Sequence, residues 1–155
     1  MSDATKPPGE LSVELVTDDR GLEACLSVRT AVFVEEQGVP AAREIDGRDE
    51  EASHLLAVAD GPVGTLRIRD VDSESGGGGT AKIERVAVLE AHRGLGIGRR
   101  LMTTAEEHIA EQPYGRIYLE AQVEVLAFYR GLGYEVRSEP FDDVGIPHRA
   151  MDKQL

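Results

Sequence analysis

A glycine- and arginine-rich stretch, HRGLGIGRRLM at residues 92–102, has the residue types of an anion-binding turn. Its three glycines alternate with other residues, at Gly94, Gly96 and Gly98. Arg93 precedes them and Arg99 follows them, although the chain carries a formal net charge of -12. Glycine lets a backbone approach a ligand closely, and the N–H groups at the start of a helix attract anions. The stretch therefore indicates a phosphate-binding loop, or else an ordinary turn before an exposed helix.

Two common phosphate motifs do not fit this stretch. A dinucleotide-binding G-x-G-x-x-G pattern needs glycine at position 99 or 101, where the chain has Arg99 and Leu101. A P-loop needs Gly-Lys followed by Ser or Thr, which the sequence lacks. The remaining R-G-x-G-x-G pattern does not by itself decide between a ligand site and a structural turn.

Longer segments carry a resemblance to a known family. The segment ERVAVLEAHRGLGIGRRLM (84–102) resembles the coenzyme-A-binding core of the GNAT superfamily of N-acetyltransferases, with the signature Q/R-x-x-G-x-G/A at Arg93 to Gly98. The segment QVEVLAFYRGLGYEV (122–136) resembles a second family motif and includes Tyr129; Gln122 replaces the usual asparagine and Val125 the usual alanine. Residues 31–57 and the GIPH at 145–148 resemble one branch of the superfamily. The resemblance covers most of residues 11–153.

The resemblance implies a donor site for acetyl-coenzyme A. Backbone amides of the glycine loop would hold the diphosphate, and one strand would offer main-chain groups to the pantetheine arm. The implied donor-binding residues are Val86, Ala87, Val88, Arg93, Gly94, Leu95, Gly96, Ile97, Gly98, Arg99 and Gln122. We expect no metal, because the four histidines show no metal-ligand spacing and have no cysteine partners.

Acetyl transfer to an amine also needs proton-handling groups. An amine with a pKa near 10 costs roughly 4 kcal/mol to deprotonate at pH 7, and a base lowers this barrier. Glu84 is the candidate base, with an exposed strand carboxylate as the alternative. The family role of proton donor to the leaving thiolate falls on Tyr129, with a core tyrosine as the alternative. A backbone N–H near Val86 could stabilise the carbonyl oxygen.

Most candidate residues for binding the acceptor amine follow from helical spacing and not from a motif. Arg29, Phe33 and Gln37 recur every four residues on one helical face and could line the acceptor pocket, although a core edge with a snorkelling arginine fits equally. His148, next to a proline, could face the acceptor. Cys25 lies on an apolar helical stripe and is expected in the core. The acidic run DGRDEE (46–51) is expected to be a solvated loop.

The order of the elements predicts an α/β fold. Strands are expected at 11–17, 53–60, 63–71, 81–89, 116–123, 134–139 and 148–154, and helices at 18–37, 98–111 and 124–133. Residues 53–71 read as a hairpin around Gly61-Pro62. This order predicts one domain with a mixed β-sheet flanked by helices, which the resemblance makes a GNAT-like acyl-CoA N-acyltransferase fold. Residues 1–9 are expected to be a disordered tail and 10–155 the N-acetyltransferase domain.

The composition of the chain restricts the cellular location and the binding partners that we expect for it. The 155 residues include one cysteine, 29 acidic residues and 17 basic ones. An acidic chain argues against nucleic acid as a partner, and the longest aliphatic run is far too short for a membrane helix. A cytoplasmic monomer or homodimer is expected.

We therefore predict an N-acetyltransferase that moves an acetyl group from acetyl-CoA to a primary amine by direct transfer. Its partners would be a coenzyme A thioester and an amine acceptor. The main alternative is a non-catalytic acyl-CoA-binding sensor, and a structural or interaction domain is a third.

Overall fold

The computed structural model describes residues 10–71 and 79–155, which divide into two compact units. Unit 1 comprises Met1–Arg67 and Arg85–Glu107, and unit 2 comprises Ile68–Glu84 and His108–Leu155. Two strands and one helix continue from one unit into the other. The predicted tail at 1–9 lies outside the described residues, as do residues 72–78.

Unit 1 begins with strands that were predicted from alternating apolar residues. β1 (Ser12–Leu15) pairs antiparallel with β2 (Ser53–Val58), and β2 neighbours β3 (Pro62–Asp70). The turn between β2 and β3 has positive φ angles of 60° at Asp60 and 129° at Gly61. The predicted hairpin is confirmed. The second half of β4 (Gly79–Val88) also belongs to this unit.

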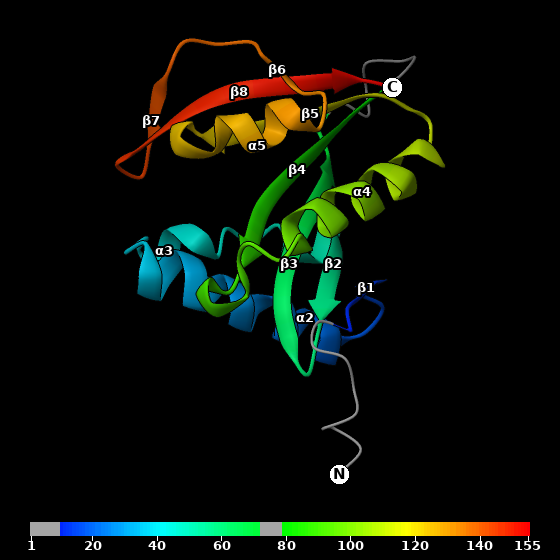
Figure 1. Cartoon of the computed structure of the whole chain (residues 1–155), viewed down its shortest axis with the longest axis vertical. Helices are drawn as coiled ribbons and strands as arrows, with labels where there is room; N and C mark the ends of the chain where they lie inside the picture. The colour runs from blue at the N-terminus through cyan, green and yellow to red at the C-terminus, as the bar shows by residue number, and fades with distance from the viewer. Residues whose placement is uncertain (1–9, 72–78) are drawn as a thin grey trace. The chain divides into compact units, whose positions relative to one another are not determined.

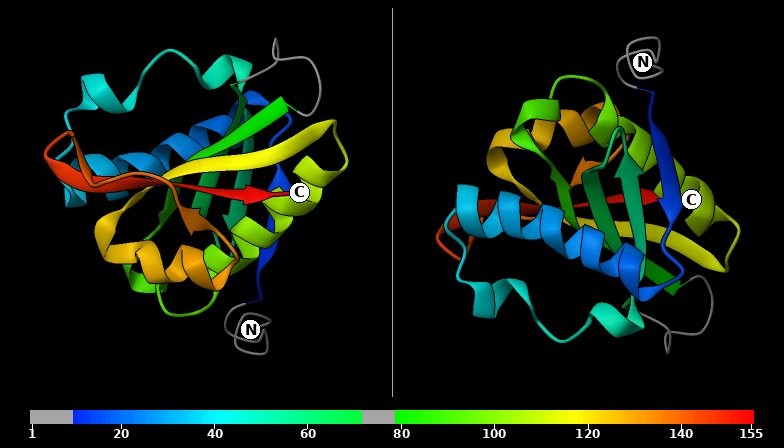
Figure 2. Two further views of the ribbon diagram at one scale, coloured as in Figure 1. Left: turned by 90° about the horizontal axis from the view of Figure 1, so that it is seen from above. Right: turned by 90° about the horizontal axis from the view of Figure 1, so that it is seen from below.

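A long helical segment of unit 1 follows β1. α2 (Asp19–Arg29) begins where the Asp18 carboxylate accepts a hydrogen bond from the Gly21 N–H at 2.8 Å, as predicted for an N-cap. It runs directly into η1 (Thr30–Glu36), a wider π-helical segment, and Figure 2 shows the two as one continuous blue ribbon. Cys25 is completely buried, with its Sγ 3.8 Å from the Leu55 carbonyl oxygen.

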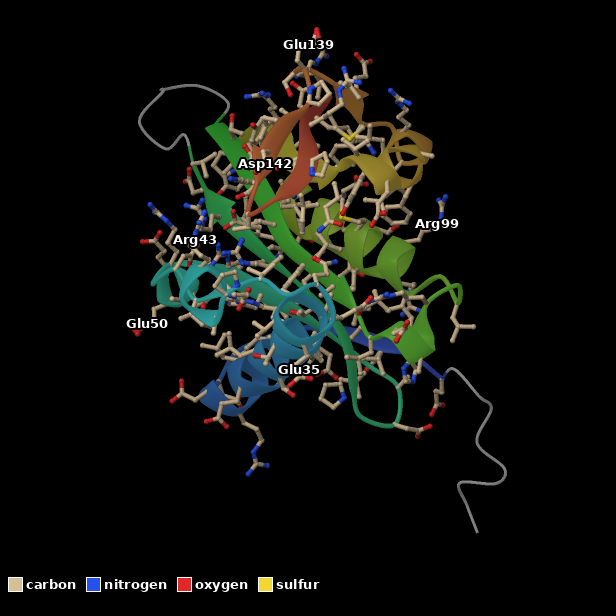
Figure 3. All side chains as sticks on the ribbon, turned by 90° about the vertical axis from the view of Figure 1, so that its left-hand side faces the viewer. Glu35, Arg43, Glu50, Arg99, Glu139 and Asp142 are labelled. Atoms are coloured by element: carbon tan, nitrogen blue, oxygen red, sulfur yellow. The ribbon has the colours of Figure 1, made fainter. Side chains whose placement is uncertain are left out.

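The segment expected to be a polar loop contains two short helices, α3 (Ala41–Glu44) and η2 (Asp49–Glu51). The acidic run DGRDEE (46–51) is exposed except at half-buried Asp49, as expected of a solvated loop, but two of its carboxylates and the preceding Glu44 bind arginines. Glu44 is 2% exposed, and Asp46 and Asp49 bind arginine side chains of unit 1. Arg43 and Glu50, which flank these three carboxylates in the sequence, are exposed and point outward in Figure 3.

After β4 the chain forms η3 (Glu90–His92), the glycine loop and α4 (Ile97–Ala110). α4 confirms the helix predicted at 98–111, and its apolar residues, which recur at helical spacing, are each at most 4% exposed: Ile97, Leu101, Met102, Ala105 and Ile109. The helix passes from unit 1 into unit 2 after Glu107.

Unit 2 is built around a mixed sheet. The first half of β4 pairs parallel with β5 (Tyr114–Gln122), and β5 pairs antiparallel with β8 (Ile146–Gln154). β8 also pairs with β6 (Glu135–Val136) and β7 (Phe141–Asp143). η4 (Val123–Val125) and α5 (Leu126–Gly131) follow β5, and α5 lies beside the red strand β8 in Figure 1. The strand expected at 134–139 is shorter than predicted, and β7 was not predicted.

Candidate active site

The glycine loop of unit 1 joins η3 to the first turn of α4. Gly94 and Gly96 have φ angles of 81° and 82°, a conformation that residues with a Cβ rarely adopt. A Cβ added to either glycine would meet no atom of the described residues within 4 Å. The loop is exposed, and the first N–H groups of α4 lie at its end. Its backbone therefore offers N–H groups and open space, which suits an anionic ligand.

Arg93, at the start of the loop, is already bound by protein groups. Its Nη1 and Nη2 donate to the two carboxylate oxygens of Glu36 at 2.7 and 2.6 Å. Its Nε donates to the Val88 carbonyl at 2.9 Å. The hydrogen bonds from Arg93 lower the pKa of Glu36, and Glu36 in turn raises the pKa of Arg93. Arg93 thus ties the end of η1 to the end of β4.

Arg99 differs from Arg93 in its surroundings. It lies in the first turn of α4, is exposed, and points away from the helix in Figure 3. Arg100 reaches the Leu11 carbonyl, to which its Nη2 donates at 3.4 Å. Arg99 is therefore the loop arginine better placed to meet an arriving ligand.

The end of β4 that enters unit 1 has an unusual backbone. Arg85 has a φ of 57°, in the left-handed region that disfavours residues with a Cβ. Val86 and Val88 are half-buried, whereas Ala87 packs into the core with Val28 and Val32. The predicted pantetheine-binding residues thus follow directly after a left-handed residue.

The predicted acceptor-binding face of the α2–η1 segment is only partly available. Arg29 is completely buried, and its guanidinium donates to Glu44 at 2.8 Å and to Asp49 at 2.7 Å. Arg29 therefore belongs to a buried ion-pair cluster and not to an acceptor pocket, which corrects the prediction. Phe33 is half-buried against the same core as Val28, and Gln37 is half-buried at the end of η1.

Tyr129 lies on α5 of unit 2 and is 8% exposed. Its ring makes edge contacts with Phe128 and Tyr134, at centroid distances of 4.9 and 6.1 Å. Burial raises the pKa of its hydroxyl to about 12. The hydroxyl therefore stays protonated across the physiological range, which a proton donor requires.

Glu84 lies on the unit 2 half of β4 and is not an exposed strand carboxylate, since its side chain is 10% exposed. The Arg69 Nε donates to its Oε2, and the Lys82 Nζ lies 3.5 Å from its Oε1. Two cations therefore stabilise the ionised form of the predicted base. Lys82 also reaches Glu120, at 3.4 Å.

Gln122 and His148 are brought together in unit 2. Their Cα atoms are register partners across β5 and β8, so their side chains share one face of the sheet. His148 is 8% exposed and stacks on Phe141, with a centroid distance of 6.1 Å and an interplanar angle of 24°. Its Nδ1 lies 2.7 Å from the Ile146 carbonyl. A carbonyl can only accept, so Nδ1 carries the proton and Nε2 of the neutral ring is an acceptor.

Sequence reasoning missed the arginines that bind the acidic run. Arg67 on β3 is 1% exposed and binds Asp46 and Asp49. Arg85 binds Glu44 and Asp46. The available signal was an arginine inside the otherwise apolar strand sequence VGTLRI, which is uncommon unless a partner is present. Among residues 10–71 and 79–155, no group of three or more His, Cys, Asp or Glu side chains could hold a metal ion.

A family model described as the acetyltransferase (GNAT) domain matches residues 17–155. The chain belongs to the GNAT acetyltransferase family. It is 39% identical over 142 residues to the uncharacterized N-acetyltransferase YjcF of Bacillus subtilis, covering 90% of this chain and 96% of the relative. The resemblance inferred from the sequence is confirmed.

Solved structures confirm the GNAT fold. The match to an acyl-CoA N-acyltransferase from Pseudomonas aeruginosa has a TM-score of 0.81 at 31% identity, covering 93% of this chain and 99% of that one. The match to Escherichia coli ElaA has a TM-score of 0.79 at 30% identity, covering 92% and 99%. The predicted mixed sheet flanked by helices is thus confirmed, and this GNAT protein is an acyltransferase by family. None of its described helices is both long enough and apolar enough to cross a membrane.

Proposed function

We propose that this GNAT protein is an N-acetyltransferase that moves an acetyl group from acetyl-CoA directly to a primary amine. The observation that carries the proposal is the open glycine loop at the start of α4, with Gly94 and Gly96 in a conformation that exposes backbone N–H groups. This loop occurs in a chain that matches the acetyltransferase family over residues 17–155. The Pseudomonas aeruginosa relative, named as an acyl-CoA N-acyltransferase, supports a thioester donor.

The donor site is assigned to main-chain groups more than to side chains. The loop from Arg93 to Gly98 would bind the diphosphate through its N–H groups, with Arg99 as the nearby counter-charge. The backbone of Val86, Ala87 and Val88 would bind the pantetheine arm, with Gln122 as a side-chain contact. The bound donor supplies an acetyl group activated as a thioester.

The residues of the chain would then handle charge and protons. The Val86 N–H donates to the carbonyl oxygen as its negative charge develops. Glu84 takes one proton of the ammonium through water, and the free amine nitrogen then bonds to the acetyl carbon. The remaining surplus nitrogen proton returns to the Tyr129 oxygen once the tyrosine has given its own proton to the sulfur. As the carbon–sulfur bond breaks, the sulfur takes the proton of Tyr129. The ionised state of Glu84, which Arg69 and Lys82 stabilise, keeps it ready to accept a hydrogen bond from the ammonium or the water.

The acceptor would be oriented by Phe33, Gln37 and His148. His148 offers Nε2 as an acceptor for an amine proton, because Nδ1 donates to the Ile146 carbonyl. Phe33 offers an apolar wall.

One experiment tests the proposal. The protein is incubated with acetyl-CoA and a panel of small primary amines, and free thiol is measured over time. Amine-dependent thiol release with formation of the acetylated amine is the expected result. Coenzyme A binding without thiol release would favour the non-catalytic sensor instead. Absence of both binding and release would overturn the donor site itself.

A further inference from the structure

Six charged side chains of unit 1 form an ion cluster, buried at Arg29, Arg67 and Glu44 and partly exposed at Arg85 and Asp46, that acetyl transfer does not by itself explain. We name it the arginine–carboxylate cluster. Three of its members are cationic and three anionic: Arg29, Arg67, Arg85, Glu44, Asp46 and Asp49. They come from α2, β3, β4 and the acidic segment 44–49, so the cluster joins elements far apart in the sequence.

Two of the arginines fix the acidic segment in place. Arg29 binds Glu44 and Asp49, with its guanidinium donating at 2.8 and 2.7 Å. Arg67 binds Asp46 at 2.8 Å and Asp49 at 2.9 Å. Both arginine side chains are 1% exposed. A buried charge is costly unless it is well paired, so the acidic segment has little freedom to move away from α2 and β3.

The third arginine, Arg85, also binds the acidic segment, at Glu44 and Asp46. The Arg85 Nε lies 2.9 Å from Glu44 Oε2, and its Nη2 donates to the Glu44 carbonyl at 3.1 Å. The same Nη2 lies 3.4 Å from Asp46 Oδ2. Asp49 binds Arg29 and Arg67, and no contact between it and Arg85 occurs in the described residues.

Arg85 is also the left-handed residue of β4. Its φ of 57° is disfavoured for any residue with a Cβ, so its side-chain contacts help to maintain this conformation. A left-handed residue within a strand redirects the peptide groups that follow it. Those groups belong to Val86, Ala87 and Val88, and the Val86 N–H is the proposed donor to the carbonyl oxygen.

We propose that Glu44 and Asp46 are positioning residues for acyl transfer: they hold Arg85 in its left-handed conformation and so aim the Val86 N–H. This inference rests on the proposed function. In this proposal Glu44 and Asp46 act on the reaction indirectly, by fixing the backbone conformation of Arg85, and not by contact with substrate.

Substitutions at position 85 separate backbone geometry from side-chain charge. Arg85→Ala removes the contacts and retains a Cβ, so we expect kcat to fall about 10²- to 10³-fold, the range for a misplaced or lost oxyanion donor, with an unchanged KM for acetyl-CoA. Arg85→Gly removes the same contacts but adopts a positive φ readily. We expect Arg85→Gly to recover most of the lost kcat.

Variants of the three carboxylates test the positioning role and supply its matched control. We expect Glu44→Gln and Asp46→Asn to lower kcat at an unchanged KM for acetyl-CoA. Asp49→Asn alters the same cluster away from Arg85, so it should lower the thermal midpoint while leaving kcat per folded molecule unchanged. Wild-type kcat in Arg85→Ala, or equal losses in Arg85→Ala and Arg85→Gly, would overturn the proposal.

A failure of the proposed N-acetyltransferase function can be distinguished from a failure of the positioning role. If the wild-type protein releases no thiol with any amine, the positioning role is judged from the NMR amide signals of Val86, Ala87 and Val88. Shifts of these signals in Arg85→Ala that are largely reversed in Arg85→Gly would support the backbone role. Unchanged signals in Arg85→Ala would refute it.

Discussion

At the scale of single residues, Tyr129 shows how burial changes the acidity of a side chain. Its ring is held by two aromatic neighbours, and desolvation alone raises the pKa of its hydroxyl to about 12. The raised pKa keeps the hydroxyl protonated but also makes it a weaker acid, so burial alone does not make Tyr129 a better proton donor. The same burial would also suit a tyrosine that only packs, so a substitution must distinguish the two roles.

Replacement of Tyr129 by phenylalanine keeps the ring and removes the hydroxyl proton. We expect kcat to fall by about 10²–10⁴-fold, the usual contribution of a general acid, with little change in coenzyme A affinity. Raising the pH should not restore the rate, because a more basic solution does not replace a proton donor. Tyr134→Phe, which alters the adjacent ring, is the control and should retain full kcat. A pH–rate profile of both variants checks this, and full activity in Tyr129→Phe would remove Tyr129 from the mechanism.

At the scale of elements, the glycine loop depends on backbone conformation and on the contacts at its first residue. Gly94 and Gly96 have positive φ, whereas Arg93 is fixed between Glu36 and Val88. Arg93 therefore acts first as a structural tie, and the loop N–H groups and Arg99 remain for the diphosphate.

A valine at position 96 should abolish coenzyme A binding. Its Cβ meets no protein atom of the described chain, but its branched side chain would occupy ligand space and its backbone would resist a φ of 82°. Gly61→Val is a control for strain, because Gly61 also has a positive φ and open space but lies in the β2–β3 turn. Calorimetric titration should show normal coenzyme A affinity for Gly61→Val. Unchanged affinity in folded Gly96→Val would refute the phosphate assignment.

Substitutions of Arg93 and of Glu36, which form an ion pair, should have opposite effects on coenzyme A affinity. Arg93→Ala leaves the Glu36 carboxylate without its cation next to the loop, so it should weaken coenzyme A more than a phosphate-free pantetheine fragment. Glu36→Gln leaves Arg93 cationic, so it should tighten coenzyme A binding, and added salt should diminish the effect. Titrations of both ligands against both variants measure this. Equal losses for both ligands would point to a damaged loop.

The sequence predicted those elements whose signals are local. The stripe from Ile97 to Ile109 on α4 and the Asp18 cap of α2 follow from spacing within a few residues. Charged residues behave differently, because their burial depends on distant partners. Nothing near Asp46 in the sequence reveals Arg67, which lies 21 residues away, and Arg29 was misread for the same reason. The short β7 exists because β8 pairs with it.

Within the candidate site, the sequence indicated the backbone features of the glycine loop better than the contacts of the charged side chains. The loop glycines have the conformation that a close approach to a ligand requires. The engagement of Arg93 by Glu36 and of Glu84 by Arg69 could not be read from the sequence, because each pair joins separate elements. The roles of Tyr129, Gln122 and His148 stay predictions.

At the scale of the whole molecule, buried ionisable groups predict how stability depends on pH. Burial lowers the pKa of His54 below 6.5. The unfolded chain therefore binds this proton more tightly, and stability should begin to fall as the pH drops below about 6.5. Arg67 lowers the pKa of Asp46. Burial would raise the pKa of Asp49, but hydrogen bonds from Arg29 and Arg67 outweigh it and lower that pKa.

These carboxylates add a second, steeper loss of stability below about pH 4. Their folded pKa values lie below the 3.8 of an unstructured aspartate, so their contribution is complete above that pH and is lost as they are protonated. Thermal midpoints measured from pH 8 to pH 2.5 check both steps. His54→Gln should abolish the step near pH 6 and leave the acid step. A flat profile down to pH 3 would contradict the role of the cluster.

The reactivity of the single cysteine, Cys25, toward thiol reagents reports whether the chain is folded. Cys25 is completely buried, and burial raises the pKa of its thiol, so it is a poor nucleophile toward colorimetric thiol reagents. Folded enzyme therefore contributes no background colour when the release of coenzyme A is followed with such a reagent. Any slow signal that appears without substrate, and that approaches one equivalent per chain, reports molecules that have opened. In an activity assay on a variant, the immediate part of the substrate-free signal therefore counts chains that are already unfolded, and the slow part gives the rate at which folded chains open.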